Sequence, residues 1–199
     1  MKKIPVRVAV LLSGGGRTLD NLFTRMDAGD LDVEIVAVIS SRAGVGGLEI
    51  ARRHGIPTEV FPRRRYDNIA SHNQAINQWL LPQGPEMIVL AGYLCFYMEP
   101  AEFSGPVVNI HPALLPKYGG KGYYGDRVHQ AVLEAEEQQS GCTVHLVDGK
   151  YDTGRILEQQ TVPVLPDDDV HSLADRVFVA ECELYPRVLQ RLAGEIRQG

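Results

Sequence analysis

Two polar residues stand two positions apart where an apolar segment ends: Asn109 and His111, within Val107-Val108-Asn109-Ile110-His111-Pro112. Because side chains alternate along a strand, residues two apart point to the same face. Pro112 cannot donate a ladder hydrogen bond, so we expect the strand to end there. The pattern places an amide and an imidazole together at the carboxyl end of a strand, where open α/β sheets bind ligands.

A carboxylate later in the chain, Asp152, is the third candidate. It lies in Lys150-Tyr151-Asp152-Thr153-Gly154, where it is equally suited to an Asx-turn and to a functional role. Together, an amide, an imidazole and a carboxylate suit the stabilisation of an oxyanion, because a nearby anion raises the pKa of a histidine and a protonated imidazole donates to developing negative charge. The sequence contains no Gly-x-Ser-x-Gly, no HExxH and no clustered metal ligands. Direct attack by a substrate's own nucleophile is therefore favoured over an acyl-enzyme.

A glycine-rich turn near the start of the chain is a candidate phosphate site. Val6–Leu12 predicts a buried strand, Ser13-Gly14-Gly15-Gly16-Arg17-Thr18 follows it, and the apolar spacing predicts a helix from about Thr18. Backbone N–H groups at such a helix start can bind an anion. The Walker pattern is absent, and Leu19 stands where a dinucleotide-binding pattern needs its last glycine. We therefore expect a phosphate site of another kind, with a tight turn that binds no ligand as the alternative.

Strands and helices alternate through the first half of the chain. Apolar strands are predicted at 6–12, 34–40 and 87–92, a brief strand at 60–61, and helices at 18–26, 48–54 and 67–81. Continuous apolar strands alternating with helices are typical of a doubly wound, parallel sheet that is covered on both faces.

The second half changes character. Residues 117–125 include four glycines and predict a mobile loop, which is followed by a helix. Alternating segments at 142–147 and 156–164 predict a hairpin that closes one side of the sheet. Asp167-Asp168-Asp169 suits the start of a final helix, which Pro186 should break or kink near Cys182.

Length, composition and charge limit the kinds of protein that this chain can be. A length of 199 residues fits one domain, residues 1–199. Three scattered cysteines argue against a disulfide framework or a zinc site and for the cytoplasm. No apolar run is long enough to span a membrane, and a net charge of −5 without a basic stripe argues against a nucleic-acid partner. The short cluster Arg63-Arg64-Arg65 predicts a solvated loop or a local anion site.

At these residues the chain resembles the phosphoribosylglycinamide formyltransferases of purine biosynthesis. The segments that carry the resemblance cover nearly the whole length: Leu11-Leu12-Ser13-Gly14, Leu90-Ala91-Gly92-Tyr93, Asn109-Ile110-His111-Pro112-Ala113-Leu114-Leu115-Pro116, Gly119-Gly120-Lys121-Gly122, Thr143-Val144-His145, Tyr151-Asp152-Thr153-Gly154 and Leu184-Tyr185-Pro186. The resemblance implies a single-domain, Rossmann-like formyltransferase fold with a C-terminal antiparallel hairpin and a closing helix. Phosphate-binding βα units would occupy about 1–92, and the folate pocket and catalytic residues about 93–199.

The resemblance also implies a reaction and a set of site residues. The amine of glycinamide ribonucleotide would attack the formyl carbon of 10-formyltetrahydrofolate, with no metal. His111 would be the general acid and oxyanion donor, Asn109 a second donor, and Asp152 the group that keeps His111 protonated and orders a water. The residues expected to hold the ribonucleotide are Gly15, Gly16, Arg17 and Thr18 at the phosphate and Glu181 at the ribose. The residues expected to hold the folate are Leu94, Cys95, Phe96, Tyr97, Asn109, Val147, Asp148 and Asp152.

Two positions differ from the usual family pattern. A Ser-Asn pair commonly follows the last glycine of the first loop, whereas this chain has Arg17-Thr18, whose guanidinium can bind phosphate bidentately. The arginine that meets the folate's glutamate tail in some members aligns with Ile69, so Arg63, Arg64 or Arg65 is the candidate for that contact.

Several readings of the function remain open. A formyltetrahydrofolate deformylase shares the catalytic set but usually carries an N-terminal regulatory domain, and a methionyl-tRNA formyltransferase adds a positively charged C-terminal domain; we expect neither domain here. Transfer to another amine and a non-catalytic folate or phosphosugar binder are further alternatives. The expected partners are small molecules, with neither membrane nor nucleic acid, and the expected state is a monomer or homodimer.

Overall fold

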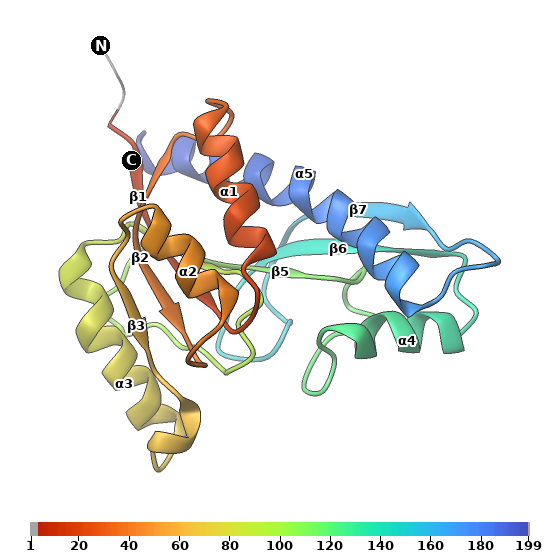
Figure 1. The fold of residues 1–199 in the computed structure, drawn as a ribbon, viewed down its shortest axis with the longest axis horizontal. Helices are drawn as coiled ribbons and strands as arrows, with labels where there is room; N and C mark the ends of the chain where they lie inside the picture. The colour runs from red at the N-terminus through yellow and green to blue at the C-terminus, as the bar shows by residue number, and fades with distance from the viewer. Residues whose placement is uncertain (1–3, 199) are drawn as a thin grey trace. The chain divides into compact units, whose positions relative to one another are not determined.

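The computed structural model describes residues 4–198, in which helices and strands alternate along the chain (Figure 1). The elements are, in chain order, β1 (Val6–Leu12), α1 (Arg17–Asp27), β2 (Val33–Ser40), α2 (Gly46–Arg53), β3 (Thr58–Val60), the 3₁₀ turn η1 (Arg63–Arg65), α3 (Ile69–Leu80), the 3₁₀ turn η2 (Leu81–Gln83), β4 (Met87–Leu90), β5 (Val107–His111), α4 (Asp126–Glu134), β6 (Gln139–Leu146), β7 (Ile156–Pro163) and α5 (Val170–Ile196).

The strands form one seven-stranded sheet in the order β3-β2-β1-β4-β5-β6-β7. β1 runs parallel to both β2 and β4, and β2 runs parallel to β3, whereas β6 and β7 are antiparallel. The predicted α/β class, with a mostly parallel sheet, a C-terminal antiparallel hairpin and a closing helix, is confirmed.

The central strands are apolar on both faces, as helix-covered parallel strands require. Residues 8–12 of β1 and all four residues of β4 are buried. Beside them, α2 contacts α1, β2 and β3. This packing fixes the end of β1, and with it the glycine turn that leads into α1.

Two helices begin with reciprocal side-chain caps. At α3, the Asn68 carboxamide accepts from Ser71 N at 2.8 Å, and Ser71 Oγ accepts from Asn68 N at 3.4 Å. At α5, the Asp169 carboxylate accepts from Ser172 N at 2.8 Å, and Ser172 Oγ accepts from Asp169 N at 2.9 Å. Each pair satisfies N–H groups that a helix start leaves without intrahelical partners. The acidic run at 167–169 therefore starts α5, as predicted.

Helix α5 runs through Pro186, so of the two outcomes expected near Cys182 the break is wrong and the kink stays a prediction. Proline removes one helical hydrogen bond, but its neighbours Leu184, Tyr185 and Val188 are fully buried. Because tertiary packing supplies most of the stability of a helix in a protein, the buried face outweighs that local loss.

Small differences in element bounds accompany this correction. The strand expected at 60–61 lies at Thr58–Val60, and the helix expected from Leu48 begins at Gly46. The helix expected at 67–81 ends at Leu80 and continues as a 3₁₀ turn. Such ends depend on capping contacts that apolar spacing does not encode.

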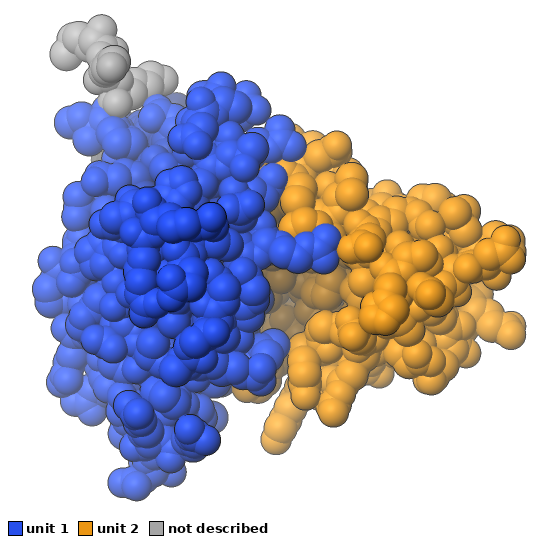
Figure 2. All heavy atoms as spheres, in the orientation of Figure 1, with its two compact units in different colours: residues 1–108, 189–199 blue, residues 109–188 orange. Residues whose placement is uncertain are grey.

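The chain divides into two compact units (Figure 2). Unit 1 ends at Val108 and also takes in the chain from Leu189 onward, and unit 2 is Asn109–Val188. The expectation of one domain with halves that meet near residue 92 stays a prediction. Among residues 4–198, no helix combines the length and apolar character needed to cross a membrane.

Candidate functional site

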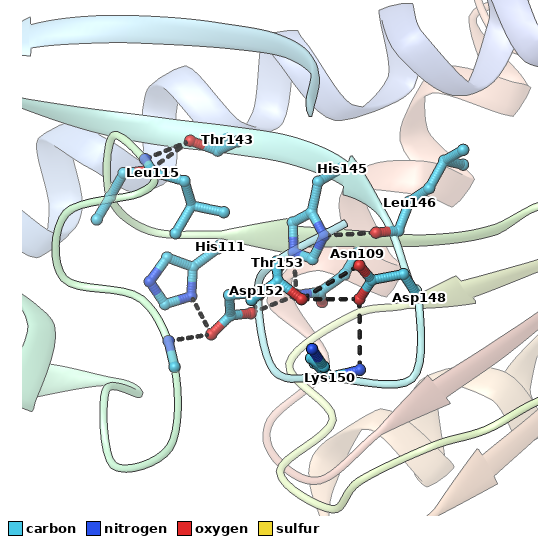
Figure 3. Close-up of polar contacts among 12 residues, drawn as sticks. Asn109, His111, Leu115, Thr143, His145, Leu146, Asp148, Lys150, Asp152 and Thr153 are labelled. Carbon is cyan, nitrogen blue, oxygen red and sulfur yellow. Dashed lines mark hydrogen bonds and ion pairs between the residues drawn. The ribbon is translucent and has the colours of Figure 1, made fainter. Parts of the chain in front are cut away.

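Asp152 is the centre of a polar cluster in unit 2 (Figure 3). Its carboxylate accepts from Gly120 N at 2.9 Å and from Asn109 Nδ2 at 3.4 Å, and its side chain is 11% exposed. The same carboxylate lies 3.7 Å from His111 Nδ1. Unit 2 therefore brings together the three residues that the sequence singled out.

The turn between β6 and β7 presents Asp152 to this cluster. Asp148 accepts from Lys150 N at 3.3 Å and from Thr153 Oγ1 at 2.9 Å, so Asp148 is the residue that closes the turn. Asp152 itself has left-handed backbone, with φ of 55°. Of the two roles open to Asp152, the structure places it in the polar cluster and gives the turn-closing contacts to Asp148.

The two ring nitrogens of His111 have different neighbours. Nε2 lies 2.7 Å from the Tyr118 carbonyl oxygen, which can only accept, so Nε2 carries a proton. Nδ1 faces Asp152 at 3.7 Å, which is longer than a hydrogen bond. The imidazole is thus held in one tautomer and turns Nδ1 towards the carboxylate.

Burial lowers the pKa of His111 below its ordinary value of 6.5, although Asp152 and the Tyr118 carbonyl both act to raise it. Burial also acts to raise the pKa of Asp152, but contacts with His145, His111 and Gly120 N outweigh this and lower it. Asp152 is therefore ionised near neutral pH. Asp152 favours the charged form of His111, as expected, yet burial is the larger effect and leaves the imidazole mainly neutral at that pH.

His145 belongs to the cluster and was not among the predicted site residues. Its Nδ1 donates to the Leu146 carbonyl at 2.8 Å, so Nε2 is left to accept from Asn109 Nδ2 at 3.1 Å. Nε2 also lies 3.5 Å from Asp152. The available signal was the alternation along β6, which puts His145 on the same side of the strand as Thr143.

Thr143 fixes the path of the chain beyond His111. Its hydroxyl donates to the Ala113 carbonyl at 2.6 Å and accepts from Leu115 N at 3.1 Å. Gln159, on β7, donates both to this hydroxyl at 2.8 Å and to the Leu115 carbonyl at 3.0 Å. The hairpin thus supports the segment that follows β5.

A cavity of about 350 Å³ reaches Asp152 within unit 2. Its lining residues are Leu115, Pro116, Gly119, Gly120, Tyr151, Asp152, Thr153, Gly154 and Ile156. The predicted Gly-rich loop forms one wall, and its residue Tyr118 is anchored by a hydrogen bond from its hydroxyl to Glu137 at 2.8 Å. Tyr118, like Asp152, has left-handed backbone, with φ of 56°.

The predicted phosphate loop lies in unit 1. Gly16 precedes α1 with φ of 84°, and a Cβ there would lie 2.5 Å from Gly47 Cα. Gly47 N donates to the Gly14 carbonyl at 3.2 Å, so the start of α2 packs directly on this turn. The N–H groups of the first turn of α1 have no partner within that helix. Gly15, Gly16, Arg17 and Thr18 lie at this helix start, and their role in binding a phosphate stays a prediction.

The remaining predicted residues divide between the units. In unit 1, Leu94 is 41% exposed, Cys95 and Phe96 are half-buried, and Tyr97 is 2% exposed. In unit 2, Val147 is half-buried and Asp148 is exposed. Glu181, half-buried on α5, acts with burial to raise the pKa of Cys142 on β6 to about 12. Cys142 is thus an uncharged thiol, and Glu181 faces β6.

Potential metal ligands do not gather in this part of the molecule or elsewhere in residues 4–198: no group of three or more His, Cys, Asp or Glu side chains is placed to hold an ion. The donor set around Asp152 is instead one carboxylate, one amide and two imidazoles, all within hydrogen-bonding or ion-pair range. Such a set can stabilise charge on a substrate oxygen and move a proton.

Comparison with known proteins matches residues 6–189 to the formyl transferases. A chloroplastic phosphoribosylglycinamide formyltransferase of Vigna unguiculata is 38% identical over 95% of this chain and 61% of its own length. The phosphoribosylglycinamide formyltransferase of Haemophilus influenzae is 36% identical over 92% of this chain and 85% of its own length. The chain thus spans less than two thirds of the length of the plant relative.

Solved structures give the same likeness. Glycinamide ribonucleotide transformylase 1 of Symbiobacterium toebii superposes with a TM-score of 0.88 at 32% identity, over 98% of this chain and 90% of that one. A phosphoribosylglycinamide formyltransferase of Brucella melitensis gives a TM-score of 0.83 at 41% identity, over 95% and 96% of the two chains.

Proposed function

Because the chain belongs to the formyl transferase family, we propose that it transfers a formyl group from 10-formyltetrahydrofolate to the amine of glycinamide ribonucleotide, a step of de novo purine biosynthesis. The names of the relatives support this choice of substrate. The observation that carries the proposal is the convergence of Asn109 and His111 on the Asp152 carboxylate, because this donor set suits a carbonyl oxygen that gains negative charge.

The bound folate supplies an activated formyl group, and the reaction needs no covalent bond to the protein. The amine nitrogen forms a bond to the formyl carbon, and the bond from that carbon to the folate nitrogen breaks. The amine loses one proton and the folate nitrogen gains one, so no proton is gained or lost overall. The protein therefore has to stabilise the oxygen charge and carry one proton between two nitrogens.

Asn109 is the first donor to the developing oxyanion. Its two amide protons meet His145 at 3.1 Å and Asp152 at 3.4 Å. The longer contact is the one that a substrate oxygen would replace, while His145 continues to hold the amide in place. A donor fixed in this way loses little entropy when charge develops, which is the source of its catalytic effect.

His111 acts as the acid. Burial keeps its pKa below the ordinary value, but negative charge on the formyl oxygen acts in the same direction as Asp152 and favours the imidazolium. The ring therefore becomes charged by taking up, at Nδ1, the proton that the attacking amine loses, and Nδ1 then donates that proton to the folate nitrogen as the bond to the formyl carbon breaks. Asp152 faces Nδ1 at 3.7 Å and would stabilise this charge, and its carboxylate would also order a water beside the reacting group.

Binding of the two small molecules follows the predicted residues. Gly15, Gly16, Arg17 and Thr18 would hold the phosphate at the start of α1, and Glu181 would accept from the ribose hydroxyls. Leu94, Cys95, Phe96 and Tyr97, with Asn109, Val147, Asp148 and Asp152, would hold the folate. The three cysteines, all free thiols, support action in a reducing compartment such as the cytoplasm. The proposed state is a monomer or homodimer.

The test is an assay of the purified protein with 10-formyltetrahydrofolate, with and without glycinamide ribonucleotide. We expect tetrahydrofolate to form only when the ribonucleotide is present, together with an equal amount of formylated ribonucleotide by mass spectrometry. Tetrahydrofolate formed without the ribonucleotide would instead indicate a deformylase. Binding of both molecules without any turnover would indicate a binding protein.

A further inference from the structure

The segment Leu94–Met98 of unit 1 has an irregular backbone, with neither helical nor strand hydrogen bonds to fix its path. Its side chains separate into two sets: Leu94 and Met98 are 41% and 45% exposed, whereas Tyr97 is buried against the protein. Backbone N–H and C=O groups in such a segment need other partners. In this segment the partners are side chains.

Ser13 fixes the beginning of the segment. Its buried hydroxyl accepts from Leu94 N at 2.9 Å and lies 2.6 Å from the hydroxyl of Ser41. Because Ser13 accepts from Leu94, its own proton is available to Ser41. Ser13 also precedes the glycine turn, so the start of the segment is tied to that turn.

Asn73, on α3, holds the segment on both sides of Tyr97. Its Nδ2 donates to the Phe96 carbonyl at 3.3 Å, and its Oδ1 accepts from Met98 N at 3.3 Å. Nδ2 also donates to the Ile69 carbonyl at 3.0 Å, within the same helix. One buried amide thus fixes two backbone groups that lie two residues apart.

Asn77 stands one helical turn later on the same face of α3. Its Oδ1 accepts from the Tyr97 hydroxyl at 2.7 Å, and its Nδ2 donates to the Met98 carbonyl at 3.3 Å. Burial and the nearby charge of Glu99 raise the pKa of Tyr97, so its hydroxyl keeps the proton for this bond. The polar contacts described between α3 and this segment are all made by the side chains of Asn73 and Asn77.

Burying two amides costs free energy unless they are hydrogen-bonded, and here both are hydrogen-bonded to the segment. What the amides add is a defined path for the segment. We propose that Asn73 and Asn77 are positioning residues for the co-substrate, which set the shape of the Leu94–Met98 wall against which the folate ring binds. This inference rests on the proposed function, and neither asparagine needs to touch the folate.

The experiment compares Asn73→Ala with Gln74→Ala, the neighbouring exposed residue of the same helix. Loss of two hydrogen bonds to the segment should raise the KM for 10-formyltetrahydrofolate about tenfold in Asn73→Ala and leave the KM for glycinamide ribonucleotide unchanged. The Kd of tetrahydrofolate, measured by calorimetry, should rise by the same factor. Gln74→Ala should match the wild type in all three quantities.

Tyr97→Phe is the second variant, because it removes only one hydroxyl and keeps the ring in place. We expect about a threefold rise in the same KM, since a single hydrogen bond is lost. Equal rises in both KM values, or a lower kcat with both KM values unchanged, would show a merely structural role and overturn the inference. No change in either variant would also overturn it.

Failure of the proposed function is recognised separately. It appears as a wild-type enzyme that does not formylate glycinamide ribonucleotide. The calorimetric ratio of variant to wild type tests the positioning role on folate binding alone. A wild-type protein that bound no tetrahydrofolate would overturn both.

Discussion

The backbone around His111 decides which of its ring nitrogens meets a reactant. The Tyr118 carbonyl accepts a hydrogen bond from Nε2 at 2.7 Å, so Nδ1 alone is directed to Asp152. Asn109 is fixed in a similar way, because His145 accepts one of its amide protons. In the proposed reaction, each side chain would keep this one N–H on a protein acceptor and turn its second polar position, which now faces Asp152, to the substrate.

Removing either donor should lower turnover far more than binding. Asn109→Ala and His111→Ala are expected to reduce kcat by about 10²–10³-fold, the usual effect of losing one oxyanion donor, with both KM values within a few-fold of the wild type. Steady-state kinetics with both substrates measures this. His171→Ala, at an exposed histidine on α5, is the matched control and should retain full activity. A raised KM with an unchanged kcat would argue against the catalytic assignment.

The pKa of His111 should respond to Asp152 in a defined direction. The carboxylate acts to raise it against the effect of burial, so Asp152→Asn should lower the pKa of His111 further below 6.5. An NMR titration of the histidine ring signals in the two proteins gives the comparison. An unchanged or higher pKa in the variant would show that Asp152 does not stabilise the imidazolium.

At the scale of elements, the glycine turn between β1 and α1 depends on the close approach of α2. Gly16→Ala should be destabilising, because left-handed backbone costs a non-glycine residue about 1–2 kcal/mol and the new Cβ would also collide with Gly47. Urea denaturation measures the loss. The displaced turn should also raise the KM for glycinamide ribonucleotide.

Gly14→Ala is the matched control for stability, since a Cβ there meets nothing within 4 Å. We expect it to unfold close to the wild-type midpoint. Equal destabilisation by Gly14→Ala and Gly16→Ala would mean that the contact with α2 does not set the conformation of the turn.

Much of this element structure could be predicted from apolar spacing, because β4 is wholly buried, β1 and β2 are buried at all but one residue each, and α1 buries one face. Pro186 could not be judged in this way, since its effect depends on how much of α5 packs against the rest of the protein. The contacts that Tyr118 and Gly120 make with His111 and Asp152 could not be predicted from the sequence either. They are made by backbone atoms, which any residue type supplies.

The site was predictable where side-chain type and strand alternation acted together. Asn109 and His111 share a face of β5, and the chemistry of Asp152 completed the set. His145 shows the limit: a histidine within a buried strand is most simply a structural residue, and only the pairing of β6 with its neighbours in the sheet shows what it contacts. Strand order is a tertiary property that local sequence patterns do not contain.

For the whole molecule, three buried histidines should make stability depend on pH. Burial lowers the pKa of His72, His111 and His129 below 6.5, so the unfolded chain binds more protons than the folded protein as the pH falls through that value. Among the described residues, Nδ1 of His72 and of His129 is buried without a hydrogen-bond partner, which fits the neutral ring.

We therefore expect stability to be full above about pH 6.5 and to decline between about pH 6.5 and pH 5. Urea midpoints measured at a series of pH values across this range give the test. A midpoint that stayed constant or rose as the pH fell would contradict the assignment of neutral, buried rings. Carboxylates such as Asp168, whose pKa is held low by Arg176, should reduce the stability of the fold only at a lower pH than the histidines do.

The left-handed backbone at Tyr118 and Asp152, with φ of 56° and 55°, has a consequence for attempts to stabilise this protein. Glycine would adopt either conformation at lower cost, so a laboratory search for heat resistance alone would be drawn to these two positions. An Asp152→Gly variant recovered in this way should melt later and work more slowly, because glycine relieves the backbone but removes the carboxylate that faces His111.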